Sequence, residues 1–159
     1  MTNDLLHVVE GDARDGDAVG GAVRGADAIV SVLALTRPED EPQYSEATAA
    51  IVEAAKREGV RRIAVTANND VFGDDEVTGE FGPHAREHRR NREALKASTL
   101  DWTIVAAGWV VDEEGIGTYQ ASLDEKAAER KISPQDFATA TLDALEHDEW
   151  IGHIVGVSG

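Results

Sequence analysis

The sequence contains no cysteine, which excludes disulfide bonds, thiolate metal sites and cysteine nucleophiles. Positive charge is scarce as well: 15 basic residues, only four of them lysine, stand against 31 acidic residues and leave a net charge of −16. A surface this negative repels phosphate backbones and anionic lipids, so we expect no nucleic-acid partner and no membrane partner. No apolar run is long enough to span a membrane.

The first residues, Met1–Asp4, show no basic region followed by an apolar stretch, so we expect no secretory signal and a cytoplasmic protein. The acidity has two open explanations. It suits a high-salt cytoplasm, where screening weakens self-repulsion, or it reflects a GC-rich genome whose codons favour Ala, Arg, Asp and Gly. The length of 159 residues fits one domain, residues 1–159, with a hydrophobic core.

Apolar runs alternate with helical patterns along the chain. Strands are predicted at Leu5–Val9, Ala28–Leu35, Arg62–Thr66, Trp102–Val105 and Ile151–Val157. Helices are predicted at about 15–24, 43–58, 84–98 and 134–146, and Ser133 has the character of an N-cap for the last of them. This order predicts an α/β protein with a mostly parallel sheet of about four to five strands and flanking helices.

Five segments, spread in order over much of the chain, carry a family resemblance. They are Val9–Asp12, Gly25–Ser31, Tyr44–Thr48, Gly59–Ile63 and Leu100–Val105. Their order and spacing resemble the atypical short-chain dehydrogenases/reductases, in particular the NmrA-like NAD(P)-binding proteins. The resemblance implies a Rossmann-like fold, NAD(P) as the cofactor and oxidoreductase activity.

The phosphate-binding start of that family has no counterpart here. Its members begin with a strand, a glycine-rich loop, a helix and a second strand, whereas Met1 falls just before the equivalent of the third strand. We therefore expect an N-terminally truncated Rossmann-like domain, whether the loss is real or arises from the gene model. Gly16, Gly20 and Gly21 lack the spacing of the loop and lie among aspartates that repel phosphate. NAD(P) binding, implied by the family, is expected to be weak or absent in this chain.

The resemblance also assigns cofactor and catalytic positions. The Tyr and Lys of many relatives fall on Ala85 and Arg89, and an arginine can still hydrogen-bond a ribose hydroxyl. The positions carried over for the cofactor are Asp12, Leu33, Ala34, Leu35, Thr66 and Asn68.

Histidines supply the main candidates for proton transfer. His84 and His88 lie one helical turn apart, and both are candidate catalytic residues for acid–base chemistry. The pair could also form half of a metal site, but two surface histidines on an arginine-rich helix is the simpler interpretation, and we assign no metal. Trp109 and Tyr119 flank the loop after the fourth predicted strand and either shape a pocket or pack in the core.

Acidic loops at residues 39–41, 74–76 and 112–114 each follow a predicted strand. Because carboxyl ends of parallel strands meet at one edge, these loops predict a negative rim that attracts a cation or a cationic substrate. The alternative is that they only solubilise an acidic protein.

Three functions stay open. The first is an NAD(P)-dependent oxidoreductase relative with a degenerate cofactor site, acting on an undetermined small molecule. The second is a cofactor-free binding or regulatory protein that kept the fold and lost the chemistry. The third is a cofactor-independent isomerase or cyclase that uses His84 or His88.

The expected topology leaves one face of the sheet poorly covered. Right-handed crossovers in one direction place the helices at about 15–24, 43–58 and 84–98 on one face. Only the helix at about 134–146 remains for the other face, and it is too short to cover four or five strands. Because strands of a parallel sheet are normally buried on both faces, we expect a homodimer or a larger homo-oligomer.

Overall fold

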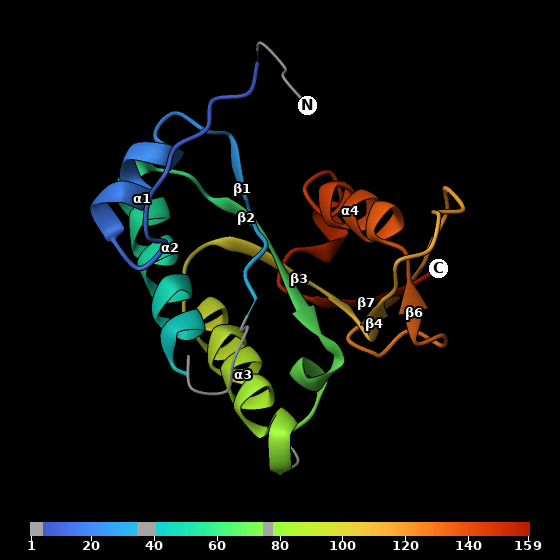
Figure 1. Ribbon diagram of the computed structural model, residues 1–159. Coiled ribbons are helices and arrows are strands. Elements are labelled where there is room, and N and C mark those ends of the chain that lie inside the picture. The colour runs from blue at the N-terminus through green and yellow to red at the C-terminus, as the bar shows by residue number, and fades with distance from the viewer. Residues whose placement is uncertain (1–4, 35–40, 75–77) are drawn as a thin grey trace.

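The computed structural model describes residues 5–34, 41–74 and 78–159. Its main sheet has five strands in the order β1-β2-β3-β7-β5 (Figure 1). Strands β1 (Ala28–Ser31), β2 (Arg62–Asn68), β3 (Asp101–Ala107) and β7 (Ile154–Ser158) pair in parallel, and β5 (Gln120–Leu123) pairs antiparallel to β7. The prediction of an α/β fold with a mostly parallel sheet of about four to five strands is confirmed.

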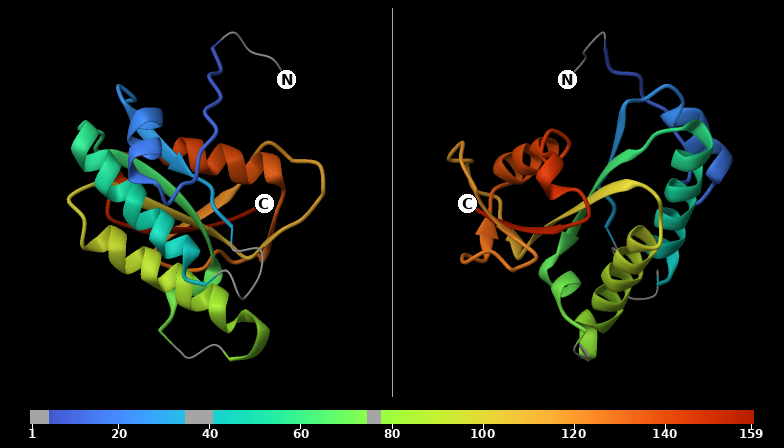
Figure 2. Two further views of the ribbon diagram at one scale, coloured as in Figure 1. Left: turned by 60° about the vertical axis from the view of Figure 1, so that its left-hand side comes forward. Right: turned by 180° about the vertical axis from the view of Figure 1, so that it is seen from behind.

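Helices cover the two faces of the sheet unequally. Helices α1 (Gly16–Val23), α2 (Gln43–Glu58) and α3 (Gly82–Lys96) lie on one face, and α4 (Pro134–Asp143) lies on the other (Figures 1 and 2). Each face has its own apolar core: one joins the sheet to α2 and α3, and the other joins it to α4. The predicted distribution of helices over the two faces is confirmed.

Helix boundaries follow local signals in the sequence. Gly59 ends α2 in the left-handed region at φ 79°, and its amide donates to the carbonyls of Ala55 and Lys56. The Ser133 hydroxyl accepts a hydrogen bond from the Asp136 amide at 3.0 Å, which is the N-cap predicted for α4. The end of α2 and the start of α4 are predictable from the sequence, because a cap is formed by residues close together in the chain.

The strand predicted at Leu5–Val9 is wrong. These residues pair with no strand of the described chain, and their side chains are exposed, Leu5 by 87%. A strand needs a neighbour for its amides and carbonyls, and β1 pairs only with β2 among the described residues. The strand predicted at Ala28–Leu35 ends already at Ser31, and Leu35 lies outside the described residues.

Three short strands escaped prediction. Strand β5 has mostly exposed residues, and β4 (Trp109–Val110) and β6 (Lys131–Ile132) form a separate two-stranded parallel sheet. Such short segments carry too little hydrophobic alternation to be recognised.

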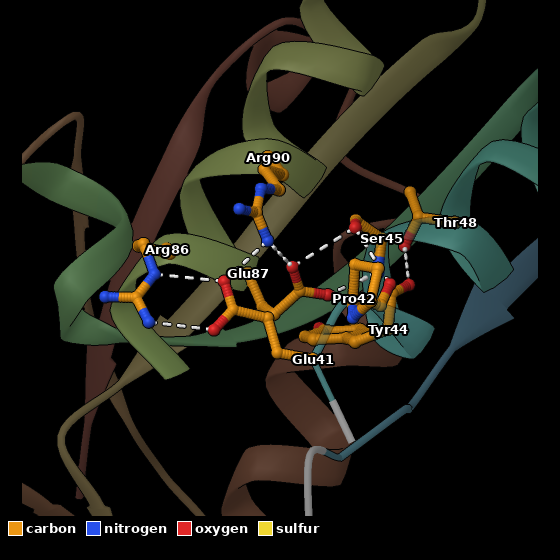
Figure 3. Close-up of polar contacts among 8 residues, drawn as sticks. All are labelled: Glu41, Pro42, Tyr44, Ser45, Thr48, Arg86, Glu87 and Arg90. Carbon is orange, nitrogen blue, oxygen red and sulfur yellow. Dashed lines mark hydrogen bonds and ion pairs between the residues drawn. The ribbon is translucent and has the colours of Figure 1, made fainter. Parts of the chain in front are cut away.

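A buried carboxylate joins α3 to the start of α2. Glu87 is fully buried and accepts hydrogen bonds from the Ser45 amide at 2.7 Å and the Ser45 hydroxyl at 3.2 Å (Figure 3). The N-cap residue of α2, Pro42, makes no side-chain cap of its own. Glu87 therefore satisfies a free amide in the first turn of α2 from the neighbouring helix.

Two arginines surround this contact. Arg90 binds Glu87 at 2.5 Å and Glu41 at 2.7 Å, and Arg86 binds Glu41 at 2.8 Å (Figure 3). The hydrogen bond from Arg86 is the main reason why the pKa of Glu41 falls to about 2. The network ties the segment before α2 to two successive turns of α3.

We expect Glu87→Ala to lower the free energy of unfolding by about 3 kcal/mol, because the Ser45 amide and Arg90 lose a buried partner. Glu87→Gln should lose only about 1 kcal/mol, since its amide oxygen still accepts from Ser45. The control, Glu53→Ala on the exposed face of α2, should change it by no more than about 0.5 kcal/mol. Urea unfolding followed by circular dichroism measures all three. Equal losses for Glu87→Ala and Glu53→Ala would contradict the capping role.

Candidate functional site

A cavity of about 450 Å³ lies at the carboxyl ends of β2 and β3. Asn68 ends β2, Gly108 follows β3, and His84 comes from the first turn of α3. The other lining residues are Asn69, Asp70, Phe81, Trp109, Lys126 and Arg130. Ligands of open α/β sheets bind at this edge, so the cavity is the candidate functional site.

The turn after β2 forms one wall of the cavity. The Asn68 side chain accepts a hydrogen bond from the Asp70 amide at 2.9 Å and caps the short 3₁₀ helix Asn69–Phe72. Arg92 of α3 donates to the Val71 carbonyl at 2.9 Å and so holds this turn against the helix. Asn68 at the end of β2 and His84 in the first turn of α3 thereby line one cavity.

The segment 124–130 contributes Lys126 and Arg130 to the cavity lining, and two glycines allow its close approach. A Cβ at Gly108 would lie 2.4 Å from the Arg130 carbonyl, which accepts a hydrogen bond from the Trp109 amide at 2.7 Å. A Cβ at Gly156 would lie 2.2 Å from the Glu125 carbonyl. Any larger residue at either position would push this segment away from β3 or β7.

The structure separates the two candidate histidines. His84 lines the cavity, whereas His88 packs edge-on against Tyr44 with ring centroids 5.3 Å apart. The His88 Nδ1 atom is buried without a hydrogen-bond partner in the described chain, and burial lowers the pKa of His88 to about 4. His88 is therefore neutral at pH 7. Within residues 5–34, 41–74 and 78–159, no group of three or more acidic or histidine side chains is placed to hold a metal ion.

Arg89 and Thr66 lie apart from the cavity. The half-buried Arg89 stands on α3 near Asp74, where it adds to the effect of Arg92, whose hydrogen bond is the main cause of the lowered pKa of Asp74. Thr66 is buried, and its carbonyl accepts a hydrogen bond from the Tyr44 hydroxyl at 2.9 Å. Desolvation raises the pKa of Tyr44 to about 12, so this hydroxyl stays protonated.

The remaining cofactor candidates are scattered. Asp12 is exposed before α1, and its hydrogen bonds to Arg14 lower the pKa of Asp12 to about 2. Leu33 packs against the core beneath α1 and α2, and Ala34 is exposed. Leu35 lies outside the described residues. Of the five described positions carried over by resemblance, Asn68 is the one that lines the cavity with His84.

Sequence reasoning missed Lys126 and Arg130, although both line the cavity. No motif marks their segment, and the one available signal was the rarity of lysine in the chain. Trp109, left open as a pocket or core residue, is 61% exposed and lines the cavity. Tyr119 instead packs against the α4 core and donates to Asp143 at 2.7 Å.

The acidic loops do not form a uniform negative rim over the described residues. Asp74 pairs with Arg92 at 2.5 Å, Glu113 lies 4.0 Å from Lys131, and Glu41 belongs to the arginine network of α3. Residues 39–40 and 75–76 lie outside the described part of the chain. Each loop thus sends at least one carboxylate to a basic partner.

A second cavity, of about 370 Å³, is an apolar groove between β1 and α4. Its lining includes Val30, Val32 and Thr66 from the sheet side, and Phe137 and Leu142 from α4. Val32 is 69% exposed and Leu142 59% exposed. The groove lies on the sheet face that α4 alone covers, beside the edge strand.

The first turns of the helices provide a test for a dinucleotide, whose pyrophosphate needs free amides at a glycine-rich turn. The Asp15 carboxylate caps α1, the Glu87 carboxylate caps α2, and Ser133 caps α4. At α3 the Gly82 amide donates to the Gly79 carbonyl, and the next residue is proline. In each first turn of the described helices, a group of the chain itself thus engages at least one backbone amide.

Residues 1–148 match a family described as NAD(P)H-binding. A (4-alkanoyl-5-oxo-2,5-dihydrofuran-3-yl)methyl phosphate reductase from Streptomyces griseus is 26% identical over 162 residues, which cover 97% of this chain and 53% of the relative. The chain thus spans about half the length of that relative.

Solved structures share the fold. The oxidoreductase ylbE from Lactococcus lactis superposes with a TM-score of 0.80 at 17% identity, over 100% of this chain and 74% of the other. A short-chain dehydrogenase/reductase from Veillonella parvula in complex with NADP gives 0.79 at 19% identity, over 99% and 74%. These likenesses show the Rossmann-like fold.

The pKa of His88 predicts a loss of stability in mild acid. The pKa of His88 is about 4 in the folded state and 6.5 ordinarily. Between pH 4 and pH 6.5 the unfolded chain therefore binds a proton at this residue and the folded chain does not. The free energy of unfolding should fall by up to about 3 kcal/mol from pH 6.5 to pH 4. Urea unfolding at a series of pH values measures this slope.

His88→Phe should flatten the slope, because it keeps an aromatic ring against Tyr44 without a titrating group. His7→Gln, a change at an exposed position before α1, serves as the control and should leave the slope as it is. An unchanged slope in His88→Phe would contradict the assignment.

Proposed function

The chain belongs to the NAD(P)H-binding family, and on this premise we propose that it is a relative of NAD(P)H-dependent oxidoreductases with a degenerate cofactor site. The observation that carries the proposal is a ligand-sized cavity at the carboxyl edge of the sheet, in a chain that caps α1, α2 and α4 with its own side chains. The cavity supports small-molecule binding. The filled caps support weak or absent NAD(P) binding by this chain.

His84 is the proposed acid–base residue, because it is the cavity-lining member of the histidine pair. Asn68 and Asn69 supply amide groups that can orient a substrate oxygen. His88 and Arg89 do not line the cavity, and their proposed role is to hold α3 in place.

We propose that the protein is cytoplasmic. No helix of the described chain is long and apolar enough to cross a membrane.

A cofactor-free binding or regulatory protein is the second candidate function. The same capped helix starts favour it, because the capping side chains compete with a pyrophosphate for the amides, while the cavity stays available for another small molecule. Reductase activity, as in the name of the Streptomyces relative, belongs to the first candidate only.

Titration with NADH and NADPH tests the cofactor site. We expect fluorescence of the reduced nicotinamide to show no saturation at micromolar concentrations, because the pyrophosphate finds carboxylates where free amides are needed. N-acetyltryptophanamide at matched absorbance controls for optical filtering. Saturable binding of either dinucleotide at low micromolar concentration would refute the degenerate site.

We further propose that the chain forms a homodimer through the groove between β1 and α4. The groove is apolar, Val32 and Leu142 on its two sides are exposed, and α4 leaves that end of the sheet face uncovered. An exposed apolar patch next to an open strand edge is a typical contact surface between copies of a chain.

Light scattering across the micromolar range should give about twice the chain mass of 17.0 kDa. Leu142→Glu should return the protein to the monomer, because it places a charge in the apolar groove. Ala49→Glu, at an exposed position of α2 on the opposite face, should leave the dimer intact. A monodisperse wild-type monomer over the whole range would end this proposal.

A further inference from the structure

From the charges around the cavity at the carboxyl ends of β2 and β3, we infer that it binds a small anionic molecule and that Lys126 and Arg130 select its phosphate group. The inference rests on the proposed function in taking this cavity as the substrate pocket. It adds the chemical class of the ligand and the two residues that recognise it.

Unpaired positive charge is unusual in this protein. With 31 acidic residues against 15 basic ones, most described arginines have a carboxylate partner, as Arg61 has in Asp101 at 3.0 Å. Lys126 and Arg130 make no ion pair and no side-chain hydrogen bond within the described chain. Both line the cavity, where Asp70 is the single acidic residue among the described lining. The pocket therefore carries an excess of positive charge inside a molecule of net charge −16.

Both residues are exposed, but backbone contacts hold the segment that carries them in place. At the start of the segment, Asp124 adopts φ 55°, its amide donates to the Ile154 carbonyl at 2.6 Å, and its carboxylate accepts from the Ile154 amide at 3.1 Å. A Cβ at Gly156 would come within 2.7 Å of the Ala127 amide nitrogen, which fixes the backbone directly after Lys126. At the other end of the segment, the Arg130 carbonyl accepts a hydrogen bond from the Trp109 backbone amide.

The two side chains suit phosphate in complementary ways. An arginine guanidinium donates two parallel hydrogen bonds to phosphate oxygens, and a lysine ammonium adds a compact charge. The exposed rings of Phe81 and Trp109 offer apolar contact to the rest of the ligand. A phosphate monoester with a small apolar or ring-shaped body matches this combination.

Nuclear magnetic resonance on the full ¹⁵N-labelled chain tests the inference, with phenyl phosphate as the probe and phenol as its uncharged counterpart. Phenyl phosphate should shift the Trp109 indole and Gly108 amide signals saturably at millimolar concentrations, and phenol should not. Added KCl should weaken the binding, because it screens the charges. Equal shifts from phenol, or no shift from phenyl phosphate, would overturn the inference without need of any variant.

The double variant Lys126→Ala/Arg130→Ala should raise the dissociation constant of phenyl phosphate about tenfold or more, from the loss of charge-assisted hydrogen bonds. Lys131→Ala is the matched control: its side chain is exposed, lies near Glu113 and lines a different hollow, so the constant should not change. Equal binding by the double variant and the control would overturn the assignment.

A parallel titration with NADPH distinguishes a phosphate monoester ligand from the phosphates of the dinucleotide. If NADPH shifts the same signals, phenyl phosphate does not, and the double variant abolishes the NADPH effect, the cations serve the cofactor and the inference is overturned. If phenyl phosphate binds and its binding depends on the two cations, the inference stands whether or not the dinucleotide titration supports the proposed function.

Discussion

The buried carboxylate of Glu87 fixes the geometry on which the candidate site depends. It lies inside the protein because the first turn of α2 supplies a hydrogen-bond donor and Arg90 supplies a charge. The contact fixes α3 against α2, and His84 lies on α3 one turn before Glu87. The same helix carries His84 to the cavity lining, and Arg92 of this helix holds the turn after β2 through the Val71 carbonyl.

The acidic composition also has a structural role inside the molecule. Asp15 and Glu87 occupy helix starts that in other proteins attract phosphate, so the chain satisfies its own amides with its own carboxylates. Arginines then neutralise several acids near the edge of the sheet. This internal pairing accounts for most of the basic residues and leaves the cavity segment as an exception.

Much of the fold was predictable, because its signals are local. The period of buried residues and the glycine at position 59 predict α2, and serine, proline and aspartate in sequence predict the start of α4. The apolar pattern of Leu5–Val9 is equally clear, yet no strand forms. Pairing is a property of the neighbour across the sheet, and the sequence of a segment does not reveal whether that neighbour is there.

The site was less predictable than the fold for the same reason. Asn68 and His84 were recognisable from their place after a strand and on a helix, and both line the cavity. Lys126 and Arg130 were not, because they reach the cavity through backbone contacts with two glycines that are distant in sequence. A close approach of this kind depends on the absence of a Cβ, which no pattern of charge or hydropathy records.

The open edge of β1 has a kinetic consequence. Among the described residues, one backbone edge of the four-residue strand β1 is unpaired beside an apolar groove, and another chain can add to such an edge in ordered assembly or in aggregation. Two copies, each with a net charge of −16, repel one another before these surfaces meet. The repulsion acts over the Debye length, which is about 10 Å at 0.1 M salt. The association rate of two copies therefore depends on ionic strength: it is low in dilute buffer, where the charges repel, and it rises as salt screens them.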